Sequence, residues 1–114
     1  MGGSELDWSS ERRNGGSVVA PSGRVDEATA NAFSERLSAE AQAADGVLVI
    51  DLAGVEYMSS RGLRALTLAQ RKGAESGTVI ALARPNPIMR EILAISRYDM
   101  IFRVSETIED AFAT

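Results

Sequence analysis

Apolar residues recur every three or four positions between residues 30 and 41, and most of the positions between them are polar or charged. This spacing predicts an amphipathic helix that begins near Glu27 and buries one face. Asp26 is placed to cap the N-terminus of this helix, and the pair Asp45-Gly46 is expected to end it. The segment therefore carries the signals for both helix boundaries in its own sequence.

Three later segments are also predicted to be helical. The first of them begins near Ser60 and ends around Ser76-Gly77, because glycine readily stops a helix. The next begins at Pro87, since proline is favoured at the first helical position. Its apolar stripe, expected to face the core, consists of Ile88, Ile92 and Ile95. The last helix follows Thr107, which stands with Asp110 at the spacing of a capping box.

The remaining apolar runs predict strands. The polar segment 6–13, interpreted as an edge strand, precedes the turn signal Asn14-Gly15-Gly16, and residues 17–20 then form the returning strand of a hairpin. Pro21 and Gly23 are expected to break that strand. Three further strands are predicted at residues 47–50, 78–83 and 101–104. The first of these three is wholly apolar, which is typical of a central strand covered by helices on both faces.

The alternation of strands and helices predicts the fold class. After the hairpin the order is helix, strand, helix, strand, helix, strand, helix, which implies right-handed crossovers between parallel strands. We therefore expect an α/β fold in which a mixed, mostly parallel sheet, opened by the hairpin, is packed with about four helices. The whole length of 114 residues suits a single domain, expected over residues 6–114. Residues 1–5, mostly small, are expected to form a disordered N-terminus.

The composition excludes several classes of active site. The chain has no histidine and no cysteine, so it cannot form a Ser-His-Asp triad, a thiolate nucleophile, a disulfide or a zinc finger. Its 45% hydrophobic and 25% charged residues are typical of a soluble globule with one core. These features favour a binding or signalling protein over an enzyme, and they predict neither a metal nor a cofactor.

The charge and hydropathy of the chain limit which partners and which cellular compartment are expected. The net charge is −4, which disfavours nucleic acid as a partner because phosphates require basic surface. The charge is uneven: residues 1–57 carry −6 and residues 58–114 carry +2. The longest apolar run is too short to span a bilayer, and the first residues lack the pattern of a signal peptide. We therefore expect a cytoplasmic protein that does not insert into membranes.

The most informative segment joins the predicted strand 47–50 to the helix that begins near Ser60. Residues 53–58 are expected to be a loop, followed by two adjacent hydroxyls, Ser59 and Ser60, at the helix start. The segment has neither the P-loop pattern nor a Gly-x-Ser-x-Gly elbow. One serine can cap the helix through a backbone N–H, and one can be a phosphorylation site, because a helix N-terminus tolerates negative charge. The two roles are compatible.

This segment resembles the signature of the STAS-domain family, and within it that of the bacterial anti-sigma factor antagonists. The family pattern runs roughly Asp-Leu-Ser-x-Val-x-Phe/Tyr-Ile/Met-Asp-Ser-Ser/Thr-Gly-Leu, and residues 51–63 here read Asp-Leu-Ala-Gly-Val-Glu-Tyr-Met-Ser-Ser-Arg-Gly-Leu. Residues 22–26, 101–104 and 109–111 also fit the family. The resemblance extends over residues 12–113.

The resemblance implies a phosphorylation-controlled partner switch. By position Ser60 is the phosphoacceptor, with Ser59 as a second candidate. The kinase would be an anti-sigma factor of the histidine-kinase-like ATPase fold, which would itself use ATP and Mg²⁺, and a PP2C-type phosphatase would reset the switch. The unphosphorylated antagonist would sequester the anti-sigma factor and so liberate the sigma factor. The surface facing this partner is expected to contain Asp26, Tyr57, Met58, Ser59, Arg61, Gly62 and Arg64.

Two positions depart from the family pattern. Ser59 replaces a frequent aspartate, and Arg61 replaces a small residue, which adds a cation that can pair with a phosphate or contact the partner. Arg61 and Arg64, with Arg71-Lys72 further along, form either a basic stripe for an acidic partner or an ordinary solvated helix face.

Several other residues each fit two roles. Tyr57 and Met58 are either exposed anchors or packed under the loop. Asp26 has a helix cap as an equal alternative, and Asp51 is expected to fix the loop after its strand. Two alternatives to the switch are a STAS subunit of a sensory or transport complex that is never phosphorylated, and a small hydrolase that uses Ser60, for which no neighbouring base is visible.

Overall fold

The computed structural model describes residues 6–13 and 15–113, so the predicted N-terminus 1–5 and the turn residue Asn14 lie outside the described residues. The elements are β1 (Asp7–Arg13), β2 (Gly16–Val25), α1 (Ala30–Ala43), β3 (Val47–Asp51), β4 (Val55–Met58), α2 (Ser60–Glu75), β5 (Val79–Ala83), α3 (Pro87–Ile95), the 3-10 helix η1 (Tyr98–Met100), β6 (Val104–Ser105) and α4 (Ile108–Phe112).

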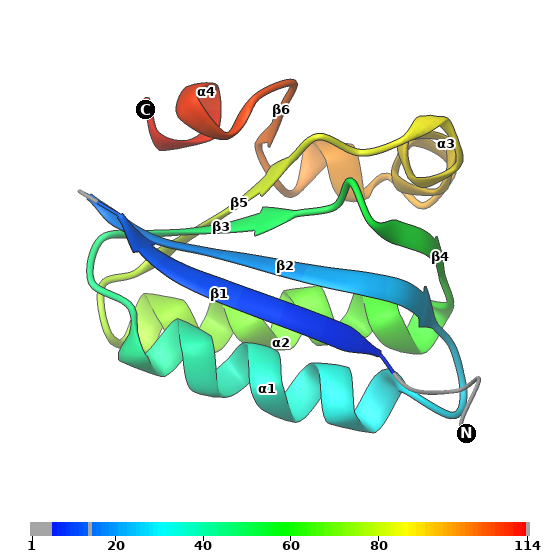
Figure 1. The fold of residues 1–114 in the computed structure, drawn as a ribbon, viewed down its shortest axis with the longest axis horizontal. Helices are drawn as coiled ribbons and strands as arrows, with labels where there is room; N and C mark the ends of the chain where they lie inside the picture. Colours follow the sequence, from blue (N-terminus) through cyan, green and yellow to red (C-terminus); the bar gives the residue numbers. More distant parts are fainter. Residues whose placement is uncertain (1–5, 14, 114) are drawn as a thin grey trace.

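One mixed sheet organises the molecule. Its strand order is β1-β2-β3-β5-β6, and β4 pairs with the far end of β2. The pair β1–β2 is antiparallel, whereas every other pair is parallel. Figure 1 shows α1 and α2 side by side along one face of this sheet, with α4 on the opposite side. The predicted fold class, a hairpin followed by a mostly parallel sheet with four α-helices, is confirmed.

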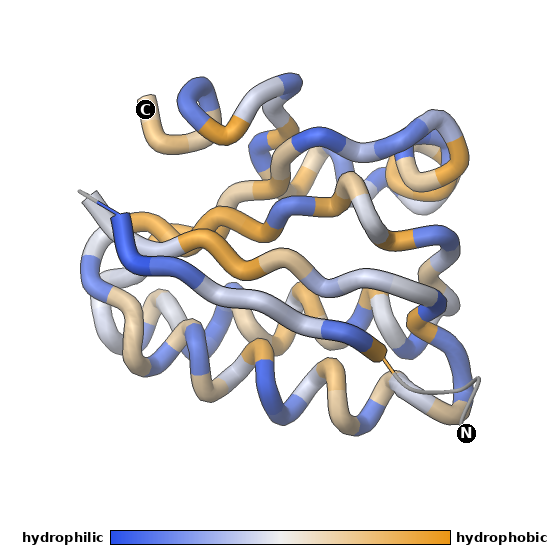
Figure 2. Tube along the Cα trace, in the orientation of Figure 1, coloured by the Kyte–Doolittle hydropathy of each residue, from blue (hydrophilic) through white to orange (hydrophobic). Residues whose placement is uncertain are grey.

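The central strand β3 is buried on both faces, as its apolar sequence predicts. Leu48 and Ile50 belong to the main core, where they pack with residues of α1 and α2 such as Phe33 and Leu66. Val49 points to the other face and packs in a second cluster with Ala111 of α4. Figure 2 shows the corresponding hydrophobic band along the middle strands. Full burial of such side chains stabilises the fold by about 1.5–3 kcal/mol each.

The strand β2 is longer than its sequence predicts. It continues through Pro21 and ends at Val25, with a register irregularity next to Gly23. One edge of β2 pairs with β1. The other edge pairs with β3 only over residues 16–19 and with β4 only from Gly23 onward. Pro21 lies in the interval where no strand occupies that second edge, so no ladder there requires its missing N–H. The expectation that the strand breaks at Pro21 is wrong for this reason.

The expected loop 53–58 is also partly a strand. Residues 55–58 form β4, which runs parallel to the end of β2. Val55 and Met58 at its two ends are buried in the main core. The strand is too short for its alternation to stand out in the sequence, and only its pairing with β2 reveals it.

The apolar stripe expected on the third helix is wrong at two of its three positions. The third, Ile92, is partly buried and packs against the main core. In α3 the buried residues are Met89 and Leu93, whereas Ile88 is 57% exposed and Ile95 is 77% exposed. The cap of this helix fixes its rotation: the Asn86 side chain accepts from the Met89 N–H at 2.9 Å and donates to the backbone oxygen of Val55 at 2.7 Å. The contact with β4 therefore selects the buried face.

Two element boundaries also differ from the expectations. The first helix begins at Ala30 after a turn at residues 27–29, and not near Glu27. The predicted strand 101–104 is limited to β6, because residues 98–100 form η1 and the chain then turns to bury Phe102 in the core. The other three helices start where the sequence predicts. The second begins at Ser60, the third begins at Pro87, and Thr107 caps the last one.

Candidate functional site

The candidate site lies where β2 and β4 end together and lead into α1 and α2. Val25 and Met58 are paired in the parallel register, so Asp26 and Ser59 both follow directly on neighbouring strand ends. The Ser59 N–H donates to the Val25 backbone oxygen at 2.8 Å, which continues the ladder into the helix start. Loops at the carboxyl ends of parallel strands are the usual place for binding in α/β folds. The sheet thus brings two segments separated by more than thirty residues into one surface.

The two adjacent serines have different environments. Ser59 is the N-cap of α2, and its Oγ accepts a hydrogen bond from the Gly62 N–H at 3.4 Å. Ser60 is the first residue of the helix and is exposed, and no described residue hydrogen-bonds to its hydroxyl. The cap and the free hydroxyl therefore belong to different serines.

Gly62 lies in close contact with the strands beneath α2. A Cβ atom built there would be 2.4 Å from Met58 Cγ and 2.7 Å from Val25 Cγ1. Only a glycine allows the first turn of α2 to approach the ends of β2 and β4 so closely. Gly62 is buried and Met58 is 2% exposed. This corrects their place on the predicted partner-facing surface: both support that surface from below.

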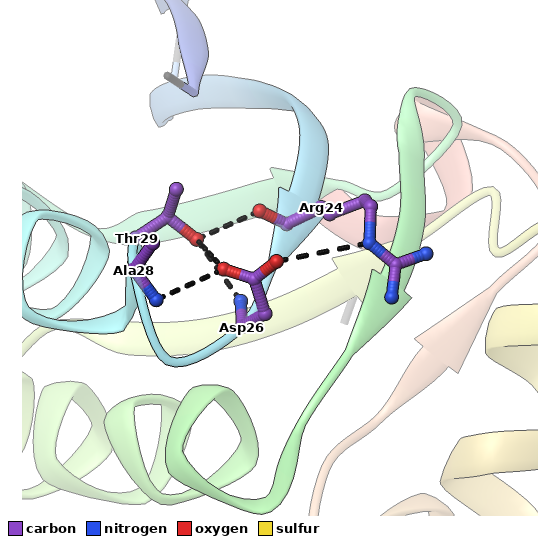
Figure 3. A network of polar contacts seen from close by, with 4 residues as sticks. All are labelled: Arg24, Asp26, Ala28 and Thr29. Atoms are coloured by element: carbon purple, nitrogen blue, oxygen red, sulfur yellow. Dashed lines mark hydrogen bonds and ion pairs between the residues drawn. The ribbon is translucent and has the colours of Figure 1, made fainter. Parts of the chain in front are cut away.

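Asp26 organises the turn before α1, as Figure 3 shows. Its Oδ1 accepts from the Ala28 N–H at 3.0 Å and lies 3.3 Å from the Thr29 hydroxyl. That hydroxyl donates to the Arg24 backbone oxygen at 2.7 Å. Arg24 Nε lies 3.7 Å from Asp26 Oδ2. Asp26 therefore caps the turn that precedes the helix, while Thr29 occupies the N-cap position of α1 itself.

Cationic side chains surround this surface. The Arg24 guanidinium lies 4.7 Å from the centre of the half-buried Tyr57 ring, a cation–π contact. Arg61 Nε lies 3.3 Å from Glu27 Oε1, and both side chains are largely exposed. Arg64 is also exposed, and it lines a groove of about 300 Å³ between α1 and α2, together with Arg61 and the apolar Ala30 and Leu68. The exposed part of the site thus carries three arginines, and the exposed Glu27 pairs with one of them.

The chain matches one known domain family over most of its length. The family model described as "Mlab, STAS domain" matches residues 9–103 of the chain. The chain belongs to the STAS domain family. One similar protein is the anti-sigma-F factor antagonist RsfB of Mycobacterium tuberculosis, 32% identical over 98 residues that cover 86% of this chain and 80% of RsfB.

Solved STAS structures superpose on this STAS domain. An anti-sigma factor antagonist from Mycobacterium paratuberculosis has a TM-score of 0.86 at 29% identity, covering 96% of this chain and 93% of that chain. The Bacillus protein SpoIIAA in its phosphorylated form has a TM-score of 0.67 at 18% identity, covering 94% of this chain and 97% of that chain. The fold of this chain is therefore that of the anti-sigma factor antagonists.

Asp51 of the STAS domain fixes the strand ends behind the site. Its Oδ1 accepts from the Ala53 N–H at 3.1 Å, as expected for a residue that holds the following loop. The Arg84 guanidinium donates to both carboxylate oxygens, at 3.0 and 3.2 Å, and so links the ends of β3 and β5. These hydrogen bonds and the carboxylate charge raise the pKa of Arg84 above its ordinary value.

The sequence analysis gave no role to three residues that contact the predicted ones: Arg24, Thr29 and Arg84. The first two lie within three residues of Asp26, so a turn motif at residues 24–29 could have revealed them. The third is 33 residues from its partner Asp51, and nothing local marks it. Over the described ranges 6–13 and 15–113, no helix is long and apolar enough to cross a membrane, and no group of acidic side chains is arranged to hold a metal ion.

Proposed function

We propose that this STAS domain is an anti-sigma factor antagonist that acts as a partner switch, controlled by phosphorylation of Ser60. When Ser60 is unphosphorylated, the domain binds an anti-sigma factor that is also a serine kinase of the histidine-kinase-like ATPase fold. Phosphorylation releases this partner, and a PP2C-type phosphatase restores binding. The similarity to RsfB, which is named an anti-sigma-F factor antagonist, supports the class of partner.

The observation that carries this proposal is the division of roles between two neighbouring serines. Ser59 holds the N-terminus of α2, whereas the Ser60 hydroxyl is exposed and bonded to no described residue. A kinase can therefore modify Ser60 without removing the helix cap. A phosphate adds about −1.5 to −2 charges, and the first helical turn tolerates negative charge. The fold is expected to survive modification while the surface charge changes.

In this cycle the domain is a substrate and not an enzyme. Transfer forms a bond between Ser60 Oγ and the γ-phosphorus of ATP, breaks the bond from that phosphorus to ADP, and moves the hydroxyl proton to a base of the kinase. Hydrolysis by the phosphatase returns inorganic phosphate and the hydroxyl. ATP and Mg²⁺ belong to the kinase, so the domain requires no cofactor. The cycle is assigned to the cytoplasm, where sigma factors act.

The exposed and half-buried residues around Ser60 are proposed to contact the partner. They come from both segments that the sheet brings together: Asp26, Tyr57, Ser59, Arg61 and Arg64. Met58 and Gly62 act by holding this surface in place, since both are buried. A phosphate in the middle of such a contact would have to be desolvated against the partner, which weakens binding.

The test uses the anti-sigma factor kinases encoded in the source genome, with binding measured by calorimetry and phosphate incorporation measured by mass spectrometry. Ser60→Ala should bind without responding to ATP, and Ser60→Asp should bind at least about tenfold more weakly. Ser59→Ala is the matched control, and it should still be phosphorylated at Ser60. Phosphate found only at other residues, with both Ser60 variants behaving as the unmodified sequence does, would refute the switch.

A second candidate function is that of a permanently bound STAS subunit in a sensory or transport complex. The observation that favours it is the exposed apolar surface of α3 and the segment after it, formed by Ile88, Ile95, Met100 and Ile101. Such residues are commonly covered in stable complexes. Native mass spectrometry of the protein purified from its own cells separates the two functions, because a stable complex with unmodified serines supports the subunit.

A further inference from the structure

Ser60 lies on the same face of α2 as an exposed arginine. In an α-helix, side chains four residues apart lie on the same face, with their Cβ atoms about 5–6 Å apart. The residue four positions after Ser60 is Arg64, which is exposed. The first turn of α2 contains no acidic residue that would compete for this guanidinium. The helix itself therefore places a cation within reach of any group attached to Ser60.

The neighbouring Arg61 is already engaged. Its Nε lies 3.3 Å from Glu27 Oε1, so it bridges α2 to the turn before α1. Being next to Ser60 in a helix, it also points about a quarter-turn away from it. Arg64 differs, because within residues 6–13 and 15–113 it forms no ion pair. Of the two arginines, Arg64 is the one available to a new anion.

We propose that Arg64 is the intramolecular counter-ion of the Ser60 phosphate. This inference rests on the proposed function, since it concerns the phosphorylated form. The planar guanidinium can donate two parallel N–H bonds to phosphate oxygens, and such charge-assisted pairs are among the strongest hydrogen bonds on a protein surface. The two residues lie one turn apart on the same helix, so the contact needs no movement of the backbone.

The contact changes the surface in two ways. Arg64 leaves the rim of the groove between α1 and α2, where it stands beside Arg61 in the unmodified protein. The phosphate, stabilised by a cation, also becomes fully charged at a lower pH. Phosphorylation would thus remove one positive charge from the groove and fix a dianion next to it. A partner that binds the groove through carboxylates would no longer find the Arg64 guanidinium there, and it would be repelled by the phosphate.

The experiment titrates the phosphate itself. Phosphoserine is installed at position 60 of the full chain by genetic encoding, and its second pKa is followed by ³¹P NMR. Arg64→Gln should raise this pKa by about 0.2–0.4 pH unit, as expected for the loss of one i,i+4 ion pair. The difference should shrink at 1 M salt, where the screening length is only about 3 Å. Arg71→Gln is the control, because it removes an arginine of the same helix about 16 Å from residue 60.

Two results would overturn the proposal. One is a titration of Arg64→Gln identical to that of the unmodified sequence. The other is a shift in Arg61→Gln at least as large as that in Arg64→Gln, because Arg61 would then be the counter-ion. Neither outcome depends on a kinase or on partner binding, so failure here is distinct from failure of the switch. Circular dichroism of each variant verifies that the fold is retained.

Discussion

The Gly62 N–H donates to the Oγ of Ser59 at 3.4 Å, while the hydroxyl of the next residue, Ser60, faces solvent. Two neighbouring serine side chains therefore have different structural roles at the start of α2. Ser59 satisfies one of the backbone N–H groups that every helix leaves unpaired at its N-terminus. Ser60 can change its chemistry without disturbing that bond.

The first prediction concerns stability at these two serines. Ser59→Ala should lower the free energy of unfolding by about 0.5–1 kcal/mol, because an N-cap is lost whose hydrogen bond is rather long. Ser60→Ala should stay within about 0.5 kcal/mol of the unmodified sequence, because an exposed hydroxyl without a partner contributes little. Urea denaturation of both variants gives the comparison. An equal loss of unfolding free energy in the two variants would mean that both hydroxyls cap the helix.

The second prediction tests the contact beneath α2. Gly62→Ala should destabilise the protein, because the added Cβ meets Met58 Cγ at 2.4 Å and Val25 Cγ1 at 2.7 Å. Overpacking of this kind costs about 1–3 kcal/mol, which exceeds the gain of about 1 kcal/mol that alanine brings to a helix. Arg64→Ala, two residues further on and exposed, is the control and should be nearly neutral. Thermal unfolding measures both, and a Gly62→Ala variant more stable than the unmodified sequence would contradict the packing.

The third prediction concerns the ion pair between Asp51 and Arg84, which links the ends of β3 and β5. Arg84→Met removes both hydrogen bonds to the mostly buried Asp51 carboxylate. We expect a loss of about 1–2 kcal/mol in the free energy of unfolding, and a smaller loss for Arg84→Lys, which keeps the charge but not the two-pronged geometry. Urea denaturation again provides the measurement. Equal losses for the two variants would show that geometry is unimportant here.

This pair also has a defined pH dependence. The pKa of Arg84 is raised by Asp51, so the stabilising contribution of its charge is fully present below the unfolded-state pKa and is lost only above the raised folded-state pKa. Arginine titrates only at strongly alkaline pH. The difference in stability between the unmodified sequence and Arg84→Met should therefore be constant from about pH 7 to about pH 9.

The fourth prediction addresses the face that α3 buries. Leu93→Ala should cost about 2–5 kcal/mol, because the side chain is 1% exposed and its removal leaves a cavity. Ile95→Ala should change stability by less than about 0.5 kcal/mol, because Ile95 is 77% exposed. Chemical denaturation distinguishes the two. The reverse order would restore the isoleucine stripe as the inward face.

Local sequence predicted the helix starts well because each start is capped by hydrogen bonds between residues only a few positions apart. Asn86 bonds to the Met89 N–H, and Thr107 bonds to the Asp110 N–H. The start of α1 was less accurate, because Asp26 bonds to the Ala28 N–H and the Thr29 hydroxyl in a turn and not to the helix itself. The side-chain chemistry was identified correctly there, but it serves a different local structure.

The sequence by itself determined the order of the four α-helices and of the strands other than β4, the central place of β3 and the two hydroxyls at the start of α2, because periodicity, capping residues and glycine act over a few positions. The tertiary structure alone decided the existence of β4, the rotation of α3 and the pairing of Asp51 with Arg84. Each of these depends on groups about thirty residues apart. Their meeting is set by the packing of the whole sheet, for which no short stretch of sequence carries a signal.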